Sequence, residues 1–545
     1  MIYLALSVYI YIYHSELHSH EHTIGRKDQS MDHLELTLGA LLVILVSALW
    51  GALVNLLWKP YAMARRFKEQ GLRGPEPKFW SGSIEEIKRL KKDARGTEMD
   101  VSSHDIVPRV LPHYAKWMSL YGETFFYRFG AQTRLCITDA EHAKQVLSNK
   151  FGFYTKTNPS PYFLALLGRR GLIVTVGSEW ARHRRVVSPA FTMDKLKVMT
   201  KKMADCTMSM LDSWHGQIVQ EEGQHSAVEV SSQFQELTAD VISHSAFGSS
   251  FKEGKEVFLA QKELQMLALA NILNREIPGY KYLPTERSRQ RWKLERKVRN
   301  TLMSIIQSRL GSEHSGYGND LLGLMMESTR ATHEGTGLSM DEIIDECKNF
   351  FLAGHETTSH LLTWTIFLLS TNRDWQERLR EEVVNECQME IPTADNLNKL
   401  KLVTMVLLEA LRLYSPVMVM VRKAAQDMNL GNLMIPKDTI LTMPIAIIHR
   451  NKDLWGDDAN EFNPVRFENG VTNAARHPNA LLAFSMGPRA CVGQNFAMLE
   501  AKMVVALILQ RFSFSLSPDY KHEPADRLTL QPQSGLPVVF KPLAI

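Results

Sequence analysis

The longest apolar segment of the chain lies close to its N-terminus. Residues 36–58 carry no charged side chain, and at about 1.5 Å per residue a helix of this length spans about 34 Å, enough to cross a bilayer core. Asp32 and Glu35 precede the segment, whereas Lys59 and Arg65 follow it. Because positive charge collects on the cytosolic side, the pattern predicts a single anchor with the body of the protein in the cytosol. A helix buried in a protein core is the alternative.

The segments before and after this anchor differ from it in amino-acid composition. Residues 1–30 join a short apolar run to a polar stretch dotted with histidines, and Met31 follows as a natural start. We interpret these thirty residues as an extension that the mature protein can lack. We assign residues 31–60 to the transmembrane anchor and residues 61–77 to a basic, proline- and glycine-rich hinge. Residues 78–545 form one large domain, because no repeat or flexible linker divides them.

The body shows mostly helical periodicity. A few short segments alternate with the period of strands, and residues 125–129 and 134–138 around Gly130 predict a β-hairpin. Thr138-Asp-Ala-Glu141 predicts a capping box at the start of the next helix. The predicted fold class is mainly α with small β-sheets, an α+β arrangement. Further helices are expected near residues 196–215, 229–246, 256–272, 284–310 and 494–512.

One predicted helix is unusually long. Ser339 and Glu342 form the pattern of a capping box, and apolar periodicity continues to Thr371, which predicts a helix about 48 Å long that crosses the body. A glycine, an acid and two threonines interrupt its apolar middle, in the sequence Ala353-Gly-His-Glu-Thr-Thr358. Buried polar groups lower stability unless they are paired. We therefore expect function at this point of the helix.

His355 and Glu356 also begin the H-E-x-x-H pattern of zinc proteases. The second histidine, His360, follows five positions after the first and not four. Five residues rotate a helix by about 500°, which leaves the two rings about 140° apart around the helix axis. This geometry excludes a shared zinc ion at the two histidines.

Charge and cysteine content narrow the class of protein. The chain has 63 basic and 59 acidic side chains, a net charge of +4. So small an excess argues against nucleic acid as a partner, because nucleic-acid-binding domains attract their ligand through a strong positive field. The five cysteines are scattered and form no C-x-x-C pair, which is typical of a reducing compartment.

Cys491 carries the strongest chemical signal. Glycines lie four residues before it and two after it, and an apolar helical run begins at Gln494. Unpaired N–H groups and the positive end of the helix dipole favour a thiolate at that helix start. One thiolate is too few for a zinc or iron–sulfur site, whereas haem needs only one strong protein ligand. A buried free cysteine is the alternative.

The residues around Cys491 resemble a known cofactor-binding motif. The haem-binding signature of the cytochrome P450 family is matched by Phe484, Gly487, Arg489, Cys491 and Gly493. The resemblance implies the cytochrome P450 fold and haem b (iron protoporphyrin IX), with the Cys491 thiolate as axial ligand and the other four residues in the cofactor-binding loop.

The same resemblance assigns roles to residues upstream. Trp180 and Arg184 have the spacing of the Trp-x-x-x-Arg pair with which the family holds a haem propionate, and arginine suits this role because its planar fork binds a carboxylate in two places. Arg422 and Arg489 are further propionate ligands by position. Gly354 corresponds to the glycine that leaves room for O2 beside the cofactor.

The resemblance also implies catalytic roles for two polar residues of the long helix. By this resemblance Thr357 donates hydrogen bonds during oxygen activation, and Glu356 helps to relay protons. Relatives that rearrange hydroperoxides without O2 commonly lack the threonine, so its presence favours an oxygenase.

A structural triad is also implied by the resemblance. Glu409 and Arg412 stand three residues apart in an apolar helical pattern between Lys399 and Tyr414, and Arg466 lies in a Pro-x-Arg-Phe turn. Apolar flanks predict that the pair is buried, and losing one partner of a buried pair costs about 3–5 kcal/mol. In the family this triad holds the haem-side loop in shape.

The function implied by the resemblance is that of a plant monooxygenase of the endoplasmic reticulum, closest to the group of hormone-modifying and fatty-acid hydroxylases. It inserts one oxygen atom from O2 into a C–H bond of a hydrophobic small molecule: a fatty acid, a terpenoid or an isoprenoid- or steroid-like hormone. The family contacts substrate at segments that are nearly all apolar here, at residues 161–167, 350–352, 417–421 and 534–536.

The expected electron donor is NADPH-cytochrome P450 reductase, because the chain has no G-x-G-x-x-G segment of its own. We expect a single-pass protein of the endoplasmic reticulum membrane with its catalytic domain in the cytosol. Two alternatives remain open. One is an oxygen-independent haem-thiolate isomerase or dehydratase, and the other is a non-catalytic haem protein that binds a ligand.

Overall fold

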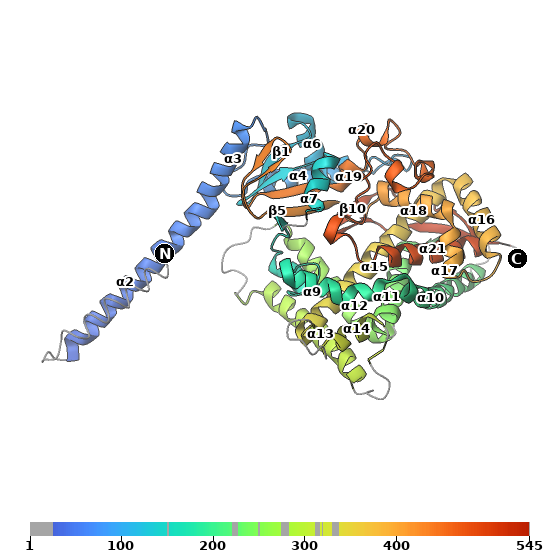
Figure 1. Ribbon diagram of the computed structural model, residues 1–545, viewed down its shortest axis with the longest axis horizontal. Helices are drawn as coiled ribbons and strands as arrows, with labels where there is room; N and C mark the ends of the chain where they lie inside the picture. Colours follow the sequence, from blue (N-terminus) through green and yellow to red (C-terminus); the bar gives the residue numbers. More distant parts are fainter. Residues whose placement is uncertain are drawn as a thin grey trace.

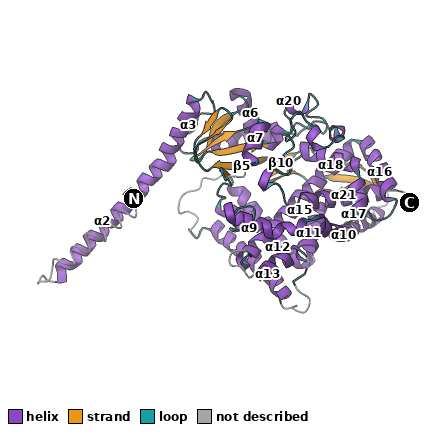
Figure 2. Ribbon diagram, viewed as in Figure 1, coloured by secondary structure: helices purple, strands orange, loops and turns teal. Residues whose placement is uncertain are grey.

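The computed structural model describes most of the chain (Figure 1). Residues 1–25, which contain most of the predicted extension, lie outside the described part. Helices dominate and the strands gather in small sheets (Figure 2), so the predicted fold class is confirmed. The described residues are 26–96, 98–149, 152–220, 227–248, 251–273, 283–310, 317–318, 320–329 and 337–543.

The helices follow the order that the periodicity predicts. The four runs expected between residues 196 and 310 are helices α10 to α13. The helical bounds are α2 Arg26–Leu53, η1 Val54–Trp58, α3 Lys59–Glu69, α4 Ile84–Arg95, α5 Val107–Val110, α6 Pro112–Tyr121, α7 Ala140–Leu147, α8 Pro161–Leu167, α9 Gly177–Val187, η2 Ser188–Phe191, α10 Met193–Gln220, α11 Val230–Phe247, α12 Phe251–Asn271, α13 Glu286–Leu310, α14 Leu321–Ser328, α15 Met340–Thr371, α16 Arg373–Cys387, α17 Ala394–Lys399, α18 Lys401–Leu413, α19 Ile445–Ile448, α20 Lys452–Trp455, η5 Pro464–Phe467, η6 Val471–Asn473, η7 Gly487–Arg489 and α21 Gln494–Arg511.

The strands form one larger sheet and three small ones. The larger sheet has the order β1-β2-β8-β5-β3, in which β2 and β8 are parallel and the other pairs antiparallel. The small sheets are β10-β11, β4-β12-β9 and β6-β7. The bounds are β1 Phe125–Phe129, β2 Gln132–Cys136, β3 Tyr154–Thr155, β4 Ala227–Glu229, β5 Val419–Ala424, β6 Met428–Leu430, β7 Leu433–Ile435, β8 Ile440–Pro444, β9 Phe512–Leu516, β10 Pro524–Arg527, β11 Thr529–Pro532 and β12 Pro537–Pro542.

Helix α15 crosses the centre of the body, as its predicted length requires (Figure 1). Ser339 and Glu342 form the predicted capping box, in which the Ser339 side chain accepts from the Glu342 N–H and the Glu342 carboxylate accepts from the Ser339 N–H. Helices α11, α18 and α21 pack against it. This central position lets α15 present its polar middle to the interior of the protein.

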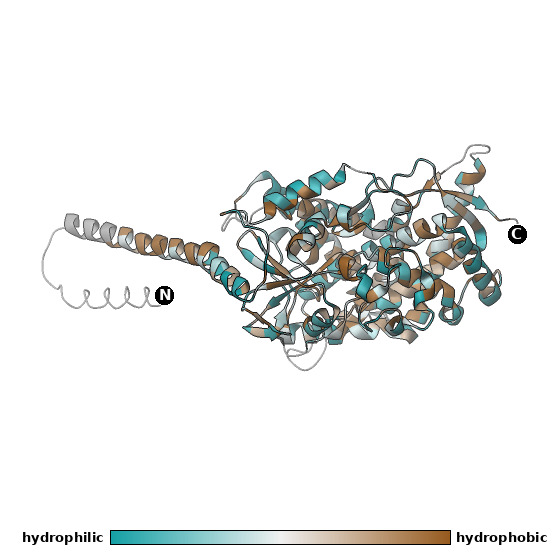
Figure 3. Cartoon of the chain, turned by 90° about the horizontal axis from the view of Figure 1, so that it is seen from above, coloured by the Kyte–Doolittle hydropathy of each residue, from teal (hydrophilic) through white to brown (hydrophobic). Residues whose placement is uncertain are grey.

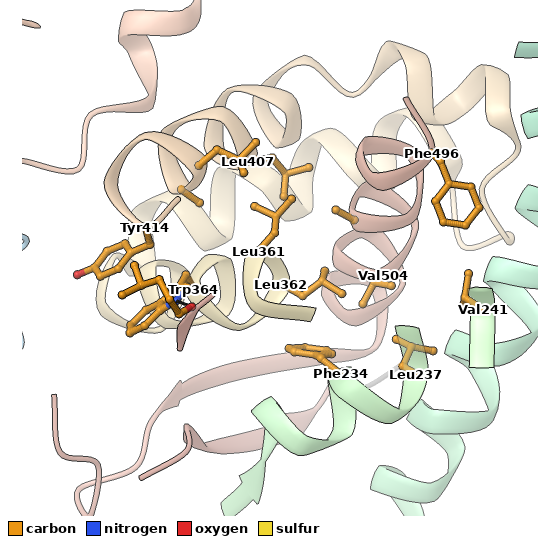
Figure 4. Close-up of a cluster of buried hydrophobic side chains, with 14 of the residues drawn as sticks. Phe234, Leu237, Val241, Leu361, Leu362, Trp364, Leu407, Tyr414, Phe496 and Val504 are labelled. Atoms are coloured by element: carbon orange, nitrogen blue, oxygen red, sulfur yellow. Dashed lines mark hydrogen bonds between the residues drawn. The ribbon is translucent and has the colours of Figure 1, made fainter. Parts of the chain in front are cut away.

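Apolar side chains from these helices form the core around α15 (Figure 4). Trp364 and Tyr414 stack with their ring centroids 4.3 Å apart. The indole N–H of Trp364 donates to the Leu530 carbonyl at 2.9 Å, which ties the C-terminal strands to the helical core. Such an aromatic pair contributes about 0.5–1.5 kcal/mol beyond the area that it buries.

The anchor prediction fits the N-terminal helix. Among the described residues, one helix is long and apolar enough to cross a membrane, the run Leu36–Glu69. Leu41 and Trp50 on it are exposed, and the run projects away from the body as a largely apolar rod (Figures 1 and 3). A π-helical turn, η1, interrupts it just before Pro60, which has no N–H to continue the regular helical hydrogen bonds.

The segment predicted as a hinge is helical in its first half. Helix α3 continues the anchor to Glu69, because the proline and glycine residues begin only at Gly71. Phe67 on α3 is fully buried and stacks on Phe126 of β1 at 5.6 Å. An added Cβ at Gly74 would lie 1.8 Å from the Phe126 carbonyl oxygen, so this position requires glycine. The anchor is therefore joined to the body through a docked helix.

One local prediction is wrong by a residue. The N-cap of α7 is Asp139 and not Thr138, since the Asp139 carboxylate accepts from the His142 N–H at 2.7 Å. Thr138 donates its hydroxyl to the Glu123 carbonyl at 3.2 Å instead. Both Thr138 and Asp139 suit an N-cap, and the hydrogen bond from Thr138 to Glu123 leaves Asp139 as the cap.

Candidate active site

The loop that carries Cys491 folds back on itself before α21. The Cys491 N–H donates to the Phe484 carbonyl at 2.9 Å. Gly487 has a φ of 70°, and an added Cβ there would lie 2.5 Å from the Leu147 carbonyl oxygen, so no other residue fits this turn. Gly493 is the N-cap of α21. The structure thus places Cys491 two residues before the N-cap of α21.

The pKa of the Cys491 thiol reflects competing effects. Burial raises it, whereas the Gly493 N–H and the positive charge of Arg184 lower it, and the net pKa lies above its ordinary value. The helix start and its N–H groups act in the direction that the sequence predicts, but burial outweighs them in the protein chain alone. A cation bound at the sulfur would reverse this balance.

A cavity of about 440 Å³ lies against this loop. Cys491 lines it, and so do Gly354 and Thr357 of α15, which are more than a hundred residues away in the sequence. Most of its walls are apolar, and these wall residues include Phe191, Ile242, Phe350, Leu361, Leu411, Val417, Val419, Met420, Val421 and Phe496. The structure therefore brings the lone cysteine and the polar break of the long helix to one cavity.

Gly354 and Thr357 sit on the cavity side of α15. The Thr357 hydroxyl donates to the Ala353 carbonyl at 2.7 Å, the bond to the preceding turn that the sequence predicts. An added Cβ at Gly354 would lie 2.9 Å from the Ile242 side chain on α11. Close packing of α11 on α15 is thus a second reason for glycine here, beyond the predicted room for O2.

Glu356 points away from the cavity into a buried polar cluster. Its Oε1 atom accepts from Gln265 at 2.9 Å and from the Thr529 hydroxyl at 2.8 Å. The Thr529 hydroxyl also lies 3.0 Å from Nδ1 of His360. Burial raises the pKa of Glu356, but His360, His355 and these hydrogen bonds outweigh it, and the net pKa lies below its ordinary value. The structure therefore separates Glu356 from Thr357, which the sequence assigned to one relay.

His355 and His360 have separate partners, as the helical geometry predicts. Nδ1 of His355 lies 2.5 Å from the Phe351 carbonyl oxygen, whereas Nδ1 of His360 faces Thr529. Among the described residues the two histidines do not belong to a common group of metal-ligating atoms. The exclusion of a shared zinc ion agrees with this arrangement.

Three basic side chains near one another line the cavity, and none of them forms an ion pair with a described acidic residue. Arg422 and Arg489 line it, together with Lys156, which the sequence analysis did not single out. Arg422 donates to the Val421 carbonyl at 2.9 Å, and Arg489 donates to the Thr175 carbonyl at 2.7 Å. Burial lowers the pKa of both arginines to about 10, and for Arg489 the charge of Arg422 adds to this effect. Cations on a cavity wall that the described residues do not neutralise favour an anion beside them.

Trp180 and Arg184 on α9 contact the cysteine loop from outside the cavity. The Arg489 guanidinium lies over the Trp180 ring, 4.3 Å from its centroid. Arg184 donates to the carbonyl of Ala490, the residue before Cys491, at 2.9 Å. Both therefore support the cysteine loop, although neither lines the cavity.

The three members of the predicted triad are in contact. Arg412 makes two hydrogen bonds of 2.7 Å to the Glu409 carboxylate, and both side chains are fully buried. Arg466 donates to the same carboxylate at 3.2 Å. The Asn463 N–H adds a further bond at 2.9 Å. Two cations and a backbone donor thus satisfy one buried carboxylate and join α18 to η5.

The expected substrate-contacting segments divide into two groups. Residues of 417–421 and of 350–352 line the cavity, whereas 161–167 and 534–536 do not. Helix α8 packs against α12 and α13 instead, and the Leu536 N–H donates to Glu229 at 2.7 Å.

Four functional candidates escaped the sequence analysis: Lys156, His183, Gln265 and Thr529. Lys156 lines the cavity without belonging to a motif, and the other three are polar residues whose partners lie far away in the sequence, so no local motif marks them.

Comparison with known proteins identifies the class of this site. The family model for cytochrome P450 matches residues 109–539. Cytochrome P450 709B1 of Arabidopsis thaliana is 49% identical over 93% of this chain and 98% of its own length. Cytochrome P450 734A1 of the same plant is 38% identical over 94% and 96%, and secologanin synthase 1 of Catharanthus roseus is 38% identical over 95% and 99%. The chain belongs to the cytochrome P450 family, among relatives from plants.

Membership of this family defines a monooxygenase that uses haem with a cysteine thiolate as axial ligand. The residues at the cavity fit that cofactor. A lone thiol, a group of cations that no described acidic residue pairs with, and apolar walls provide what an iron, two propionates and a flat apolar ring require.

Proposed function

We propose that this protein is a membrane-anchored monooxygenase that inserts one oxygen atom from O2 into a C–H bond of a fatty acid, a terpenoid or an isoprenoid- or steroid-like hormone. The observation that supports this proposal is the shared cavity of Cys491, Gly354 and Thr357. Haem, when bound there, supplies the activation of O2. The chain supplies the ligand, the anion contacts, the proton donors and the apolar walls.

Each group at the cavity has a distinct role in this proposal. The Cys491 sulfur is the axial ligand, held by the turn at Gly487. Arg422 and Arg489 bind the carboxylates of the cofactor, and Arg184 and Trp180 fix the orientation of Arg489 and of the cysteine loop from behind. Fixed guanidinium groups lose little conformational freedom on binding.

Proton delivery falls to Thr357 and Glu356. The Thr357 hydroxyl reaches the cavity and can exchange its bond to the Ala353 carbonyl for one to a bound molecule. Glu356 is held as a carboxylate on the other side of the helix by Gln265 and Thr529. In this proposal it takes up protons in the buried polar cluster and passes them towards Thr357.

The substrate is hydrophobic because the walls of the cavity are. Residues such as Phe350 and Met420 offer no hydrogen bond, so shape and apolar contact select the molecule and position one C–H bond. The comparisons do not select one of these substrate classes. One relative is named secologanin synthase, and membership of the family is compatible with each class.

Location and electron supply complete the proposal. In this proposal the run Leu36–Glu69 anchors the protein in the endoplasmic reticulum membrane and the body lies in the cytosol, an orientation that the basic residues Arg65 and Arg66 after the apolar core support. There it meets NADPH-cytochrome P450 reductase, which supplies both electrons.

The test is to incubate microsomes that contain the protein and the reductase with a panel of fatty acids, terpenoids and isoprenoid hormones. We expect a product that is one oxygen atom heavier and depends on NADPH. Cys491→Ala abolishes the product and the thiolate-type spectrum of the reduced CO complex, whereas Cys387→Ala, a buried cysteine outside the cavity, retains both. A wild-type protein without that spectrum would refute the proposal.

A further inference from the structure

Helices α10 and α11 pack side by side (Figure 1) and bring three metal-ligating side chains together. Cys206 comes from α10, whereas Asp240 and His244 stand four residues apart on one face of α11. The Cys206 sulfur, a carboxylate oxygen of Asp240 and a ring nitrogen of His244 all lie within 4.8 Å of one another. None of the three residues lines the cavity of Cys491. The cluster is therefore separate from the candidate active site.

The spacing of the two ligand atoms on α11 fits a single zinc ion. Nε2 of His244 lies 3.4 Å from Oδ1 of Asp240. Zinc holds nitrogen and oxygen ligands at about 2.0–2.2 Å in tetrahedral geometry, which places two such atoms about 3.3–3.5 Å apart. A direct charge-assisted hydrogen bond is shorter, about 2.7–2.9 Å. The two side chains are thus spaced as two ligands of one ion.

The third ligand atom, the Cys206 sulfur, is a buried thiol. It hydrogen bonds to the Asp240 carboxylate, and burial, followed by the charges of Asp240 and Glu500, raises its pKa. A metal ion that binds this sulfur replaces the proton, which leaves for the solvent. The side chains of Asp240 and His244 are 33% and 29% exposed, so an ion and a water molecule can reach the cluster from outside.

Glu500 on α21 provides independent evidence for a cation at this point. Its side chain is fully buried, and neither carboxylate oxygen has a hydrogen-bond partner among the described residues. Helix α21 packs against α10, and Glu500 lies close enough to Cys206 for its charge to raise the pKa of the thiol. A buried polar group of this kind indicates a bound water or ion. A divalent cation at Cys206 would stabilise the carboxylate.

We propose that Cys206, Asp240 and His244 bind a zinc ion between α10 and α11. Thiolate sulfur, imidazole nitrogen and carboxylate oxygen are the three types of protein ligand that zinc takes, and three of them leave a fourth position for water. Mg²⁺ and Ca²⁺ prefer oxygen ligands, so a site with sulfur and nitrogen selects against them.

The ion fixes a helix that supports the cavity wall. Ile242, two residues after Asp240, lies on the opposite face of α11 and lines the cavity. On that same face, Thr238 donates to the His355 carbonyl of α15 at 3.0 Å. Helix α11 therefore lies between the zinc site and the central helix. Zinc joins α10 to α11 and stabilises the body without taking part in the oxygen chemistry.

The experiment uses the purified full-length haem protein, stripped of loosely bound metal with EDTA and then dialysed against zinc chloride. Plasma mass spectrometry measures the bound zinc, and X-ray absorption at the zinc K-edge detects a sulfur ligand. Histidines in residues 14–22 would bind zinc without sulfur, so the sulfur signal distinguishes the two places. Cys206→Ser and His244→Gln each remove one ligand. Their matched controls are Cys387→Ser, at a buried cysteine of α16, and His215→Gln, at an exposed histidine of α10.

The wild type and both controls should bind about one zinc ion per chain, with sulfur at about 2.3 Å from the metal, and their thermal unfolding midpoints should rise when zinc is added. Cys206→Ser and His244→Gln should bind zinc at least about a hundredfold more weakly, because even the loss of a residue behind a ligand costs about ten- to a hundredfold. In EDTA, His244→Gln should remain about as stable as the wild type, which shows that it folds.

Three results would refute the site: a wild type that binds no zinc, bound zinc without a sulfur ligand, or an unchanged affinity in either ligand variant. None of these measurements depends on monooxygenase activity, so the zinc site and the proposed function are tested separately.

Discussion

The Nδ1 atom of His183 lies 2.5 Å from the Oε1 atom of Glu346, and both side chains are fully buried. The second ring nitrogen, Nε2, lies 3.3 Å from Oε1 of Glu342. Both nitrogens face carboxylates, a setting that favours the doubly protonated imidazolium form of the ring. This group fastens α9, which carries Trp180 and Arg184, to α15.

Stability should fall as the pH rises through the titration of this pair. Burial lowers the pKa of His183, but Glu346 and Glu342 outweigh it and the net pKa is raised; burial raises that of Glu346. A raised folded-state pKa gives stability below the unfolded value, near 6.5 for histidine, that is lost as the pH rises through the raised value. Urea unfolding midpoints between pH 6 and pH 9 measure this loss.

His183→Gln removes the charge and should flatten that pH dependence, at a cost of about 3–5 kcal/mol because a buried carboxylate loses its partner. Adding Glu346→Gln should recover part of the loss. His244→Gln, at a half-exposed histidine 3.4 Å from Asp240, is the control and should change stability by less than about 1 kcal/mol. An unchanged pH profile in His183→Gln would contradict the imidazolium assignment.

Thr357→Ala should separate NADPH use from product formation. Without the Thr357 hydroxyl, proton delivery in the cavity is no longer directed, and O2 is reduced to hydrogen peroxide instead. The amount of product formed per NADPH consumed should therefore fall by about tenfold or more. Thr363→Ala removes the same type of bond, from a threonine hydroxyl to the Ser359 carbonyl at 2.7 Å, outside the cavity. Equal coupling in both variants would rule out the catalytic role of Thr357.

Gly354→Ala tests the packing role of the glycine. The new methyl group meets Ile242 at 2.9 Å, and overpacking of this kind costs about 1–3 kcal/mol. The second substitution Ile242→Ala removes both side-chain atoms at this distance, Cδ1 and Cγ1, and should restore part of the thermal stability. If the double variant is no more stable than Gly354→Ala, the close approach to Ile242 is not the cause.

Arg412→Lys should destabilise the body by about 3–5 kcal/mol, because lysine cannot reproduce the fork that binds Glu409 and the surrounding carbonyls. The midpoint of urea unfolding and the haem content after purification measure this effect. Lys144→Met, which breaks an exposed ion pair with Glu141, should change stability by less than about 1 kcal/mol. A loss equally small in Arg412→Lys would show that the triad is not a structural requirement.

Local signals predicted the elements of the fold, whereas partners across the fold escaped prediction. The capping box at Ser339 and the apolar run to Thr371 define α15 to the residue, because both are read from neighbouring positions. The cavity could also be anticipated, because it forms where the loop of Cys491 meets the polar middle of α15. The orientation of Glu356 could not be predicted, because Gln265 and Thr529 hold its carboxylate from other elements.

The anchor also combines a local signal, which the sequence shows, with a distant contact, which it does not show. The apolar run is visible in the composition, but the burial of Phe67 against Phe126 depends on a strand about sixty residues further on. The sequence therefore predicts a hinge where the structure continues a helix.

In the proposed membrane-anchored protein, this docked helix fixes the orientation of the body relative to the anchor. Gln70 exchanges hydrogen bonds of 3.0 and 2.6 Å with the backbone of Met434, and Phe67 wedges α3 against the sheet, so the tilt of the body is set by packing and not by the length of a tether. Extra glycines inserted after Gly71 would leave that tilt unchanged, whereas replacing Phe67 would let the whole catalytic body swivel over the lipid surface.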